Sequence, residues 1–210
     1  MTDQTTRLPI AVYAESTPNP ISMKFVANKQ LVAGSPIEFL SSDETKSSPL
    51  ASKLFQFPFV RGVFIASNFI TVNISDAVKW DDIVLEFRGM IQQFLSEGNP
   101  VIVESVSGGE TKKDLSPSLD PNRIDSNLDA RILSDQDLLI AQILDEQIRP
   151  AVEQDGGAIN FKSFVDGKVT VELRGACSGC PSSTVTLKAG IETLLKRLVP
   201  EVKEVIAEEL

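Results

Sequence analysis

The amino-acid sequence predicts an α+β protein made of two small α/β-sandwich-like domains joined by a flexible linker. Residues 1–105 and residues 135–210 each combine short β-type runs with stretches of helical periodicity. Residues 106–134 lose this periodicity and are rich in Gly, Pro, Ser and charged residues, a composition typical of linkers. A chain of 210 residues is long enough to form two small hydrophobic cores. We therefore expect domains at 1–105 and 135–210.

In the first domain, alternating apolar residues predict short strands, and apolar residues at helical spacing predict helices. The turn Ser67-Asn68 separates two apolar runs and predicts a β-hairpin, because Asn tolerates a positive φ. Residues 41–48 are polar and are expected to form a loop. The expected strands are 11–15, 23–27, 37–39, 60–66 and 69–74, and the expected helices are 49–57 and 80–97.

In the second domain, Ser134 or Asp135 caps a predicted helix that Gln154 to Gly157 ends. Pro150 either kinks this helix or lets it continue through one weakened turn. Asp166-Gly167 favours a type I′ turn and predicts a second hairpin. The other expected elements are strands at 159–165 and 168–174, a helix at 182–199 and a strand at 202–207.

Composition excludes several classes of function. The net charge is −9, whereas nucleic-acid binding needs a basic surface, so we expect no nucleic-acid partner. No apolar run approaches the roughly 20 residues that cross a membrane, so no membrane partner is expected. Residues 1–7 resemble neither a secretion signal nor a transit peptide, which predicts a cytoplasmic protein. The sequence contains no histidine, which removes His bases, His ligands and Cys-His pairs from its own chemistry.

Both cysteines of the chain, Cys177 and Cys180, lie two residues apart between a predicted strand and a predicted helix. They could be two reduced thiols in a small core, but the neighbouring Ala176, Ser178 and Gly179 would leave the sulfur atoms accessible. A structural disulfide is not expected in a reducing compartment. Two further interpretations remain, a redox pair and a metal or cluster site.

A redox role is the main alternative, a cytoplasmic thiol–disulfide oxidoreductase that uses the Cys177–Cys180 dithiol. The start of a helix lowers the pKa of a thiol, and Cys-x-x-Cys at such a position is a redox arrangement. Against this interpretation, the cysteines lie outside any expected βαβ pattern, and no tryptophan or charged residue flanks them.

Ligand stoichiometry favours a metal or cluster site shared between two chains. Zinc and iron–sulfur clusters normally take four protein ligands, and one chain supplies two cysteines and no histidine. A second copy would supply the other two sulfur atoms, so binding should produce a homodimer. A zinc-bridged interaction module is a third possibility.

The sequence from Arg149 to Gly157, followed by that from Gly175 to Lys188, closely resembles the C-terminal domain of NifU-like proteins of the Nfu type. This resemblance covers about residues 138–206. The upstream sequence, from Ser16-Thr17-Pro18-Asn19-Pro20 to Trp80, is similar to the Nfu N-terminal domain.

The resemblance implies a non-enzymatic iron–sulfur cluster scaffold or carrier. Cys177 and Cys180 of two protomers would bind a [4Fe–4S] cluster, and a [2Fe–2S] form is left open. The expected partners are an upstream assembly scaffold that donates the cluster and apo iron–sulfur client proteins that receive it. The first domain shows no catalytic pattern, and we expect it to dock clients or partners.

Overall fold

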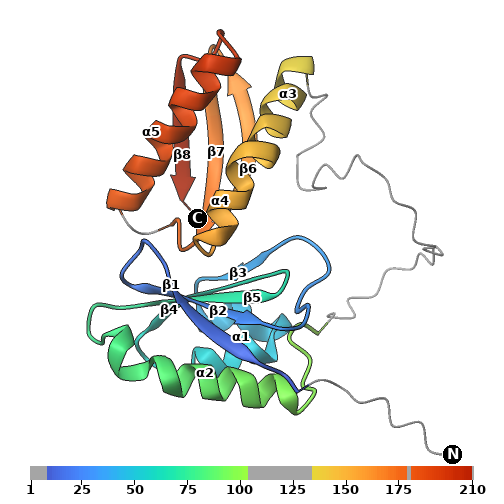
Figure 1. Ribbon diagram of the computed structural model, residues 1–210, viewed down its shortest axis with the longest axis vertical. Coiled ribbons are helices and arrows are strands. Elements are labelled where there is room, and N and C mark those ends of the chain that lie inside the picture. The colour runs from blue at the N-terminus through green and yellow to red at the C-terminus, as the bar shows by residue number, and fades with distance from the viewer. Residues whose placement is uncertain (1–8, 104–133, 179–180, 210) are drawn as a thin grey trace, which may run out of the picture.

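The computed structural model describes residues 9–103, 134–178 and 181–209. They form two sheet-containing regions, the N-terminal region (9–103) and the C-terminal region (134–178 and 181–209), which agrees with the predicted α+β class (Figure 1). The predicted linker lies outside the described residues apart from Ser134.

The N-terminal region is a five-stranded antiparallel sheet in the order β1-β2-β5-β4-β3, with two α-helices on one face (Figure 1). Its elements are β1 (Val12–Ser16), β2 (Ser22–Ala27), β3 (Ile37–Phe39), a 3₁₀ helix (Ser42–Ser47), α1 (Pro49–Leu54), β4 (Val60–Ala66), β5 (Phe69–Ile74) and α2 (Trp80–Ser96).

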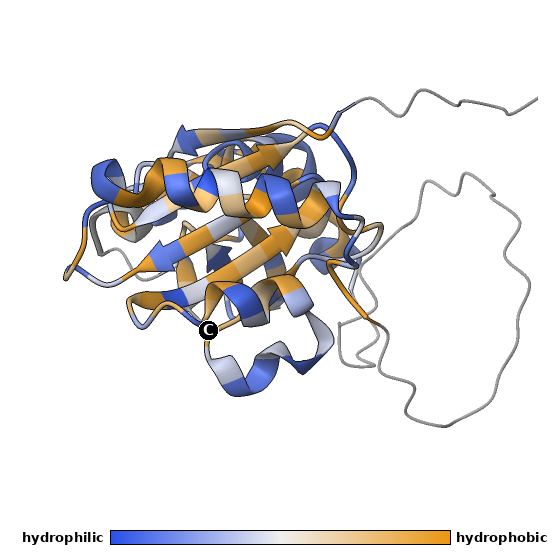
Figure 2. Cartoon of the chain, turned by 90° about the horizontal axis from the view of Figure 1, so that it is seen from below, coloured by the Kyte–Doolittle hydropathy of each residue, from blue (hydrophilic) through white to orange (hydrophobic). Residues whose placement is uncertain are grey.

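The core of this region lies between the sheet and its helices. Phe25 of β2, Leu50 of α1 and Phe87 of α2 are completely buried there, and Trp80 stacks edge-on against Phe87 at a ring-centroid distance of 5.5 Å. Figure 2 shows hydrophobic residues along the strands and in bands along the helices, as expected for elements with one buried face.

Two local expectations for this region need correction. The polar segment predicted as a loop forms the 3₁₀ helix, where the Thr45 hydroxyl donates to the Ser42 carbonyl at 2.7 Å and closes a turn. In the β4–β5 hairpin, Ser67 and not Asn68 has a positive φ, of 34°. Asn68 instead bonds to Ala27 through both its carbonyl and its side-chain amide, which holds it in the strand pairing.

The C-terminal region is a three-stranded sheet in the order β6-β7-β8, with its helices on one face (Figure 1). Its elements are α3 (Asp135–Ile143), a π-helical turn (Leu144–Ile148), α4 (Arg149–Gln154), β6 (Gly157–Val165), β7 (Lys168–Gly175), α5 (Pro181–Leu198) and β8 (Glu204–Glu209). Asp166 and Gly167 have φ of 53° and 85°, as the predicted type I′ turn requires.

Pro150 is accommodated by the π-helical turn that precedes α4. Proline lacks an N–H donor, and its ring clashes with the carbonyl four residues earlier in a regular α-helix. Here the Arg149 N–H bonds to the Leu144 carbonyl, five residues earlier, so the helix widens before the proline and then continues. The second alternative, continuation through one altered turn, is therefore the one observed.

The last strand overturns one argument from the sequence. β7 and β8 are parallel, so β7, α5 and β8 form a βαβ unit, and the cysteine segment lies where β7 leads into α5. The expectation that the cysteines lie outside any βαβ pattern is wrong. The sequence predicted a strand at 202–207, two residues before the observed bounds of β8, but not the direction in which it pairs, which depends on how α5 packs across the sheet.

Candidate functional site

Two glycines form one wall of the site around Cys177. Gly156 has a φ of 84°, and Gly157 begins β6. A Cβ atom on Gly157 would lie 2.6 Å from the Cys177 sulfur and 2.7 Å from the Arg174 carbonyl oxygen, closer than real Cβ atoms approach. The Gly156-Gly157 pair therefore leaves the room that the cysteine side chain occupies.

Gly175 ends β7 and turns the chain toward the cysteine. Its φ is 69°, and a Cβ atom there would lie 2.7 Å from the Gly156 carbonyl oxygen. The Gly175 carbonyl accepts hydrogen bonds from the Ser178 hydroxyl at 3.0 Å and from the Ser178 N–H at 3.3 Å. The turn that carries Cys177 thus depends on a residue without a side chain.

The structure buries Cys177, whose exposed fraction is 6%, in the core of the C-terminal region, so the expectation that its small neighbours leave this sulfur atom accessible is wrong. Burial in an apolar environment, with the Asp155 carboxylate as a smaller cause, raises the pKa of the Cys177 thiol from 9.0 to about 12. Cys180, the second predicted ligand, lies outside the described residues. The structure therefore places one member of the predicted ligand pair.

The raised pKa of Cys177 bears on the two chemical interpretations. A redox cysteine needs a lowered pKa, because the thiolate is the attacking species. A metal ligand can begin as a thiol, because the incoming metal ion displaces the proton. In this arrangement the surroundings of Cys177 suit a thiol that is deprotonated by its ligand and not a thiolate that is active alone.

The N-terminal region covers the cysteine segment through the Thr17–Pro20 turn. The Asn19 side-chain N–H group donates to the Ala176 carbonyl at 3.1 Å and to the Ser178 carbonyl at 3.4 Å. Asn19 has an exposed fraction of 1%, and its own side-chain oxygen accepts from the Ile21 N–H at 3.2 Å. Both carbonyls that flank Cys177 are therefore bonded to a residue more than 150 positions earlier in the chain.

The outer face of the N-terminal sheet binds the Gly-Gly segment. The Thr71 hydroxyl donates to the Gly156 carbonyl at 2.6 Å, and the Lys24 ammonium donates to the Gln154 carbonyl at 3.1 Å. Thr71 is completely buried. A Cβ atom on Gly156 would lie 2.9 Å from the Thr71 hydroxyl, so the two regions meet with no space for a side chain.

Gly175 is held by the same face. Its N–H donates to the Glu38 carboxylate at 2.9 Å, and its carbonyl accepts from the Asn73 side-chain amide at 3.3 Å. Burial raises the pKa of Glu38, although the Gly175 N–H and the Arg174 charge oppose this shift. Next to these contacts, a small apolar cluster joins Phe64, Phe69 and Ala66 of the N-terminal sheet to Ala158 of β6.

Sequence reasoning missed these covering residues. It treated Asn19 only as part of a turn, and polar residues that alternate with apolar ones on strands are normally solvent-exposed. The one available signal was composition, because the outward positions of β4 and β5 include Phe64 and Phe69, which are costly to leave in water.

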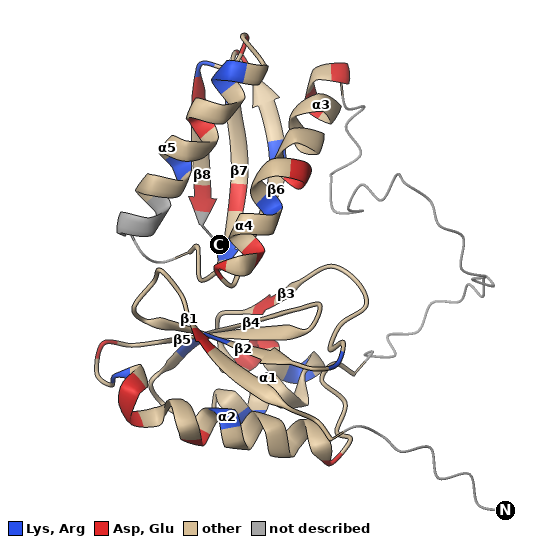
Figure 3. Cartoon of the chain, in the orientation of Figure 1, with Lys and Arg blue, Asp and Glu red and all other residues tan. Residues whose placement is uncertain are grey.

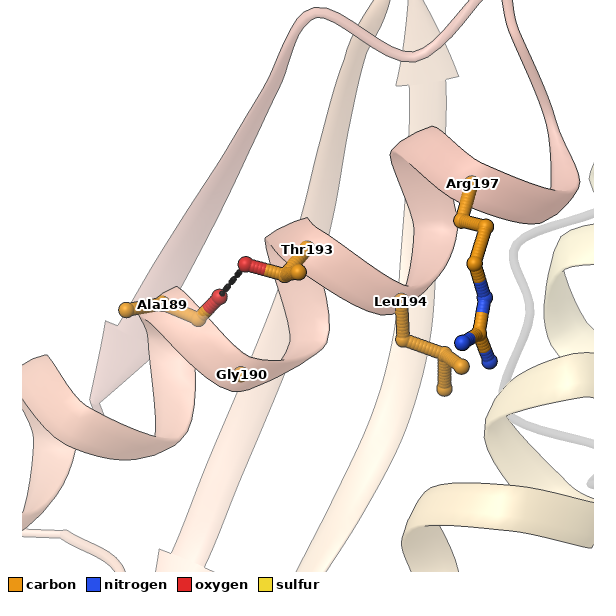
Figure 4. Close-up of a pocket in the computed structure, with 5 residues that line it drawn as sticks. All are labelled: Ala189, Gly190, Thr193, Leu194 and Arg197. Atoms are coloured by element: carbon orange, nitrogen blue, oxygen red, sulfur yellow. Dashed lines mark hydrogen bonds between the residues drawn. The ribbon is translucent and has the colours of Figure 1, made fainter.

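Other parts of the described chain offer no comparable site. A shallow hollow of about 430 Å³ runs along α5, lined by Ala189, Gly190, Thr193, Leu194 and Arg197 (Figure 4). The Thr193 hydroxyl donates to the Ala189 carbonyl at 2.8 Å, so it is already used within the helix. Within the described ranges, no three Cys, Asp or Glu side chains converge as metal ligands, and no helix is long and apolar enough to span a membrane. Lys and Arg residues are spread over both regions (Figure 3).

Comparison with known proteins agrees with this architecture. A family model described as NifU-like domain matches residues 140–206, and one described as Scaffold protein Nfu/NifU N terminal matches residues 12–98. These matches fall on the C-terminal and the N-terminal region respectively.

The relatives carry scaffold names. A Drosophila willistoni protein named NFU1 iron-sulfur cluster scaffold homolog, mitochondrial, is 36% identical over 198 residues, which cover 92% of this chain and 62% of that protein. The Drosophila sechellia protein of the same name is 34% identical over 209 residues, covering 95% of this chain and 67% of that protein. A solution structure of a NifU-like protein from Saccharomyces cerevisiae is 26% identical with a TM-score of 0.42, and covers 50% of this chain and 94% of that one.

Two sheet regions, with a Cys-x-x-Cys segment between β7 and α5, match the two domains that these family models describe. The chain belongs to the family of Nfu-type iron–sulfur cluster scaffold proteins, with the N-terminal and the C-terminal domain of that family.

The expectation of a cytoplasmic protein is wrong. It rested on the composition of residues 1–7, whereas the Drosophila relatives are named mitochondrial. The chain spans 62% of the length of the Drosophila willistoni relative.

Proposed function

We propose that this chain carries an iron–sulfur cluster, held between two copies by Cys177 and Cys180 of each, and delivers it to apo-proteins. The observation that carries the proposal is the ligand supply of the chain, two cysteines and no histidine, together with the place of Cys177 at one end of the C-terminal region. Two such chains supply the four thiolates that a cluster takes. The scaffold names of the relatives support this role.

Delivery is a ligand exchange in which no electron is transferred. Each client cysteine gives up its thiol proton as its sulfur binds iron, and each released Cys177 or Cys180 takes up a proton. The high proton affinity of buried Cys177 favours its protonated, cluster-free form over the thiolate that binds iron, and this favours release of the cluster. The cluster is therefore cargo, and the chain needs no catalytic residue for the exchange.

Anaerobic reconstitution with iron and sulfide tests the proposal. We expect visible thiolate-to-iron absorption and conversion of monomer to dimer to develop together. Cys177→Ser and Cys180→Ser should abolish both, whereas Thr193→Ala on the surface of α5 should retain both. Unchanged absorption and dimerisation in the two cysteine variants would refute the proposal.

Cluster type follows from the iron content of the reconstituted dimer. A [4Fe–4S] cluster supplies two iron atoms per chain, and a [2Fe–2S] cluster supplies one. We propose the [4Fe–4S] form. Elemental analysis of the purified protein also separates iron from zinc, which a zinc-bridged module would contain.

The βαβ setting of the cysteines is the one observation that favours the thiol–disulfide oxidoreductase. That function predicts metal-free reduction of a disulfide substrate, with turnover sustained by a dithiol reductant. The raised pKa of Cys177 predicts that Cys177 is not the attacking thiolate at neutral pH.

We also propose that the N-terminal region docks clients or the upstream scaffold that supplies the cluster. It has its own core, and its exposed residues include Tyr13 and Leu85, which are apolar or aromatic and lie on different elements. Tyr13→Ala and Leu85→Ala should leave reconstitution intact and slow transfer to at least some clients. Equal transfer rates to every client tested would count against docking through these residues.

A further inference from the structure

We infer that the outer face of the N-terminal sheet is a binding surface for the cysteine end of the C-terminal region, and that it competes for this end with a second copy of the chain. The competition rests on the proposed function, because only a shared cluster brings a second cysteine segment to Cys177. The covering of Cys177 does not rest on that function.

The N-terminal sheet is buried on both of its faces. The inward residues of β2 and β5, such as Phe25 and Ile70, pack against the helices of the same region. The outward residues Ser22 and Thr71 have exposed fractions of 2% and 0%, although they are polar and point away from that core. The Thr71 hydroxyl bonds to the Gly156 carbonyl and the Asn73 amide to the Gly175 carbonyl, and Figure 1 shows the C-terminal region standing over this face of the sheet.

The hydrogen bonds between the N-terminal region and the cysteine end involve main-chain atoms of the cysteine end and not its side chains. Asn19, Lys24, Thr71 and Asn73 donate to carbonyl oxygens, and Glu38 accepts from an N–H. Their main-chain partners are Gln154, Gly156, Gly175, Ala176 and Ser178. These residues belong to the two segments that form the wall and the turn around Cys177. A rearrangement of either segment therefore disturbs the contact with the sheet.

The cysteine end cannot bind the N-terminal sheet of its own chain and a cluster shared with a second copy at the same time. Cys177 has an exposed fraction of 6% and packs in the core of the C-terminal region, and in the closed chain the carbonyls on both sides of it are bonded to Asn19. A bridging cluster requires the cysteines of a second copy to reach the same end, where Asn19 and Phe64 now lie against the turn. Separation of the two regions must come before the second copy binds. The contact between the two regions mixes hydrogen bonds with a small apolar cluster, as transient interfaces do. We therefore expect the two regions to separate.

The first experiment measures how well Cys177 is covered, without iron. In full-length protein carrying Cys180→Ser, Cys177 is the one thiol, and its alkylation by iodoacetamide is timed at constant pH. Thr71→Arg places a large cation against the Gly156 segment and should speed alkylation about tenfold or more, because protection depends on an opening equilibrium. Thr193→Arg, the same change at an exposed position on α5, should leave the rate unchanged.

Two measurements distinguish loss of the contact between the regions from misfolding of the variant. Fluorescence of Trp80, the single tryptophan of the chain, reports whether the N-terminal core stays intact in each variant. Thr71→Val, which removes the hydroxyl but keeps the shape, should give an intermediate alkylation rate. Equal alkylation rates in the parent and in both Thr71 variants, with Trp80 fluorescence unchanged, would overturn the inference.

The second experiment separates this inference from the proposed function. Chains with both cysteines are reconstituted with iron and sulfide, and formation of the coloured dimer is timed. Thr71→Arg should form it faster than the parent, while Thr193→Arg should match the parent. Faster alkylation without a coloured dimer in any chain would support the cover and overturn the cluster role. A coloured dimer formed at equal rates, with equal alkylation, would overturn the cover and leave the cluster role standing.

Discussion

At the scale of single residues, the surroundings of Cys177 keep it a neutral thiol. Its sulfur lies against Gly157 and is shielded from water, and the Asp155 carboxylate adds to the cost of a negative charge. A metal-binding cysteine with these surroundings releases a proton when it binds, so metal affinity should rise with pH. The sequence identified Cys177 as a candidate but could not show its burial, because this depends on how the C-terminal core packs around the space that Gly157 leaves.

The pKa of Cys177 predicts how stability depends on pH. The folded chain binds this proton more tightly than the unfolded chain, so the contribution to stability is complete below about pH 9 and is lost as pH rises toward about 12. Urea midpoints at about pH 8 and about pH 10.5 should therefore fall further in the Cys180→Ser protein than in a variant that also carries Cys177→Ser. Parallel changes in the two proteins would show that Cys177 is not perturbed.

Gly157 should tolerate no larger residue. Gly157→Ala places a Cβ atom against the Cys177 sulfur and the Arg174 carbonyl, and should lower the free energy of unfolding by about 1–3 kcal/mol. Gly190→Ala is the matched control, since a Cβ atom there meets nothing within 4 Å. It lies within α5 and should raise stability by roughly 0.5–1 kcal/mol. Urea denaturation of the two variants measures both effects, and a neutral Gly157→Ala would contradict the packing described.

At the scale of elements, periodicity and turn chemistry were sufficient for most strands and helices. The Asp166-Gly167 pair correctly predicted a type I′ hairpin, and the apolar stripe correctly predicted α2. The π-helical turn before Pro150 and the parallel direction of β8 were not predictable in this way. Both depend on how a helix packs on the sheet, and residue spacing along the chain does not contain that information.

The start of α3 gives a prediction at this scale. Ser134 and Asp137 form a capping box, in which the Ser134 hydroxyl accepts from the Asp137 N–H at 3.2 Å and the Asp137 carboxylate accepts from the Ser134 N–H at 2.9 Å. Ser134→Ala should destabilise the chain by about 1 kcal/mol, within a range of roughly 0.5–2. Ser134→Asp should retain most of the stability, because Asp is also a good cap. Thermal unfolding followed by circular dichroism measures both, and equal losses would argue against the cap.

At the scale of the whole molecule, the N-terminal sheet packs against a different part of the chain on each of its faces. Its inward face completes the N-terminal core, and its outward face covers the cysteine end of the C-terminal region. Sequence reasoning described two independent domains because each has a complete hydrophobic pattern. Contacts between residues more than 80 positions apart, such as Thr71 with Gly156, follow from the docking of the two folded regions.

Asn19 tests how strongly the two regions are coupled. Asn19→Ala removes the donor for the carbonyls of Ala176 and Ser178 and should lower the free energy of unfolding by about 1–3 kcal/mol. Asn28→Ala, which removes an exposed hydrogen bond to Pro9, should change it by less than about 0.5 kcal/mol. Urea denaturation measures both variants. Equal effects would mean that the buried bond between the regions adds nothing to the stability of the chain.

Because the N-terminal sheet bonds to main-chain atoms of the cysteine turn, it constrains the backbone path of this segment and not its side chains. As long as the turn keeps its path, the sheet leaves the side chains at Ala176 and Ser178 free, and their limits come from the C-terminal region: Ala176 is buried, and the Ser178 hydroxyl bonds to the Gly175 carbonyl. The glycines at 156, 157 and 175 are not free in this way, because they fix that path. A chain with other side chains in this turn can therefore bond to the sheet in the same manner, provided that its backbone follows the same path.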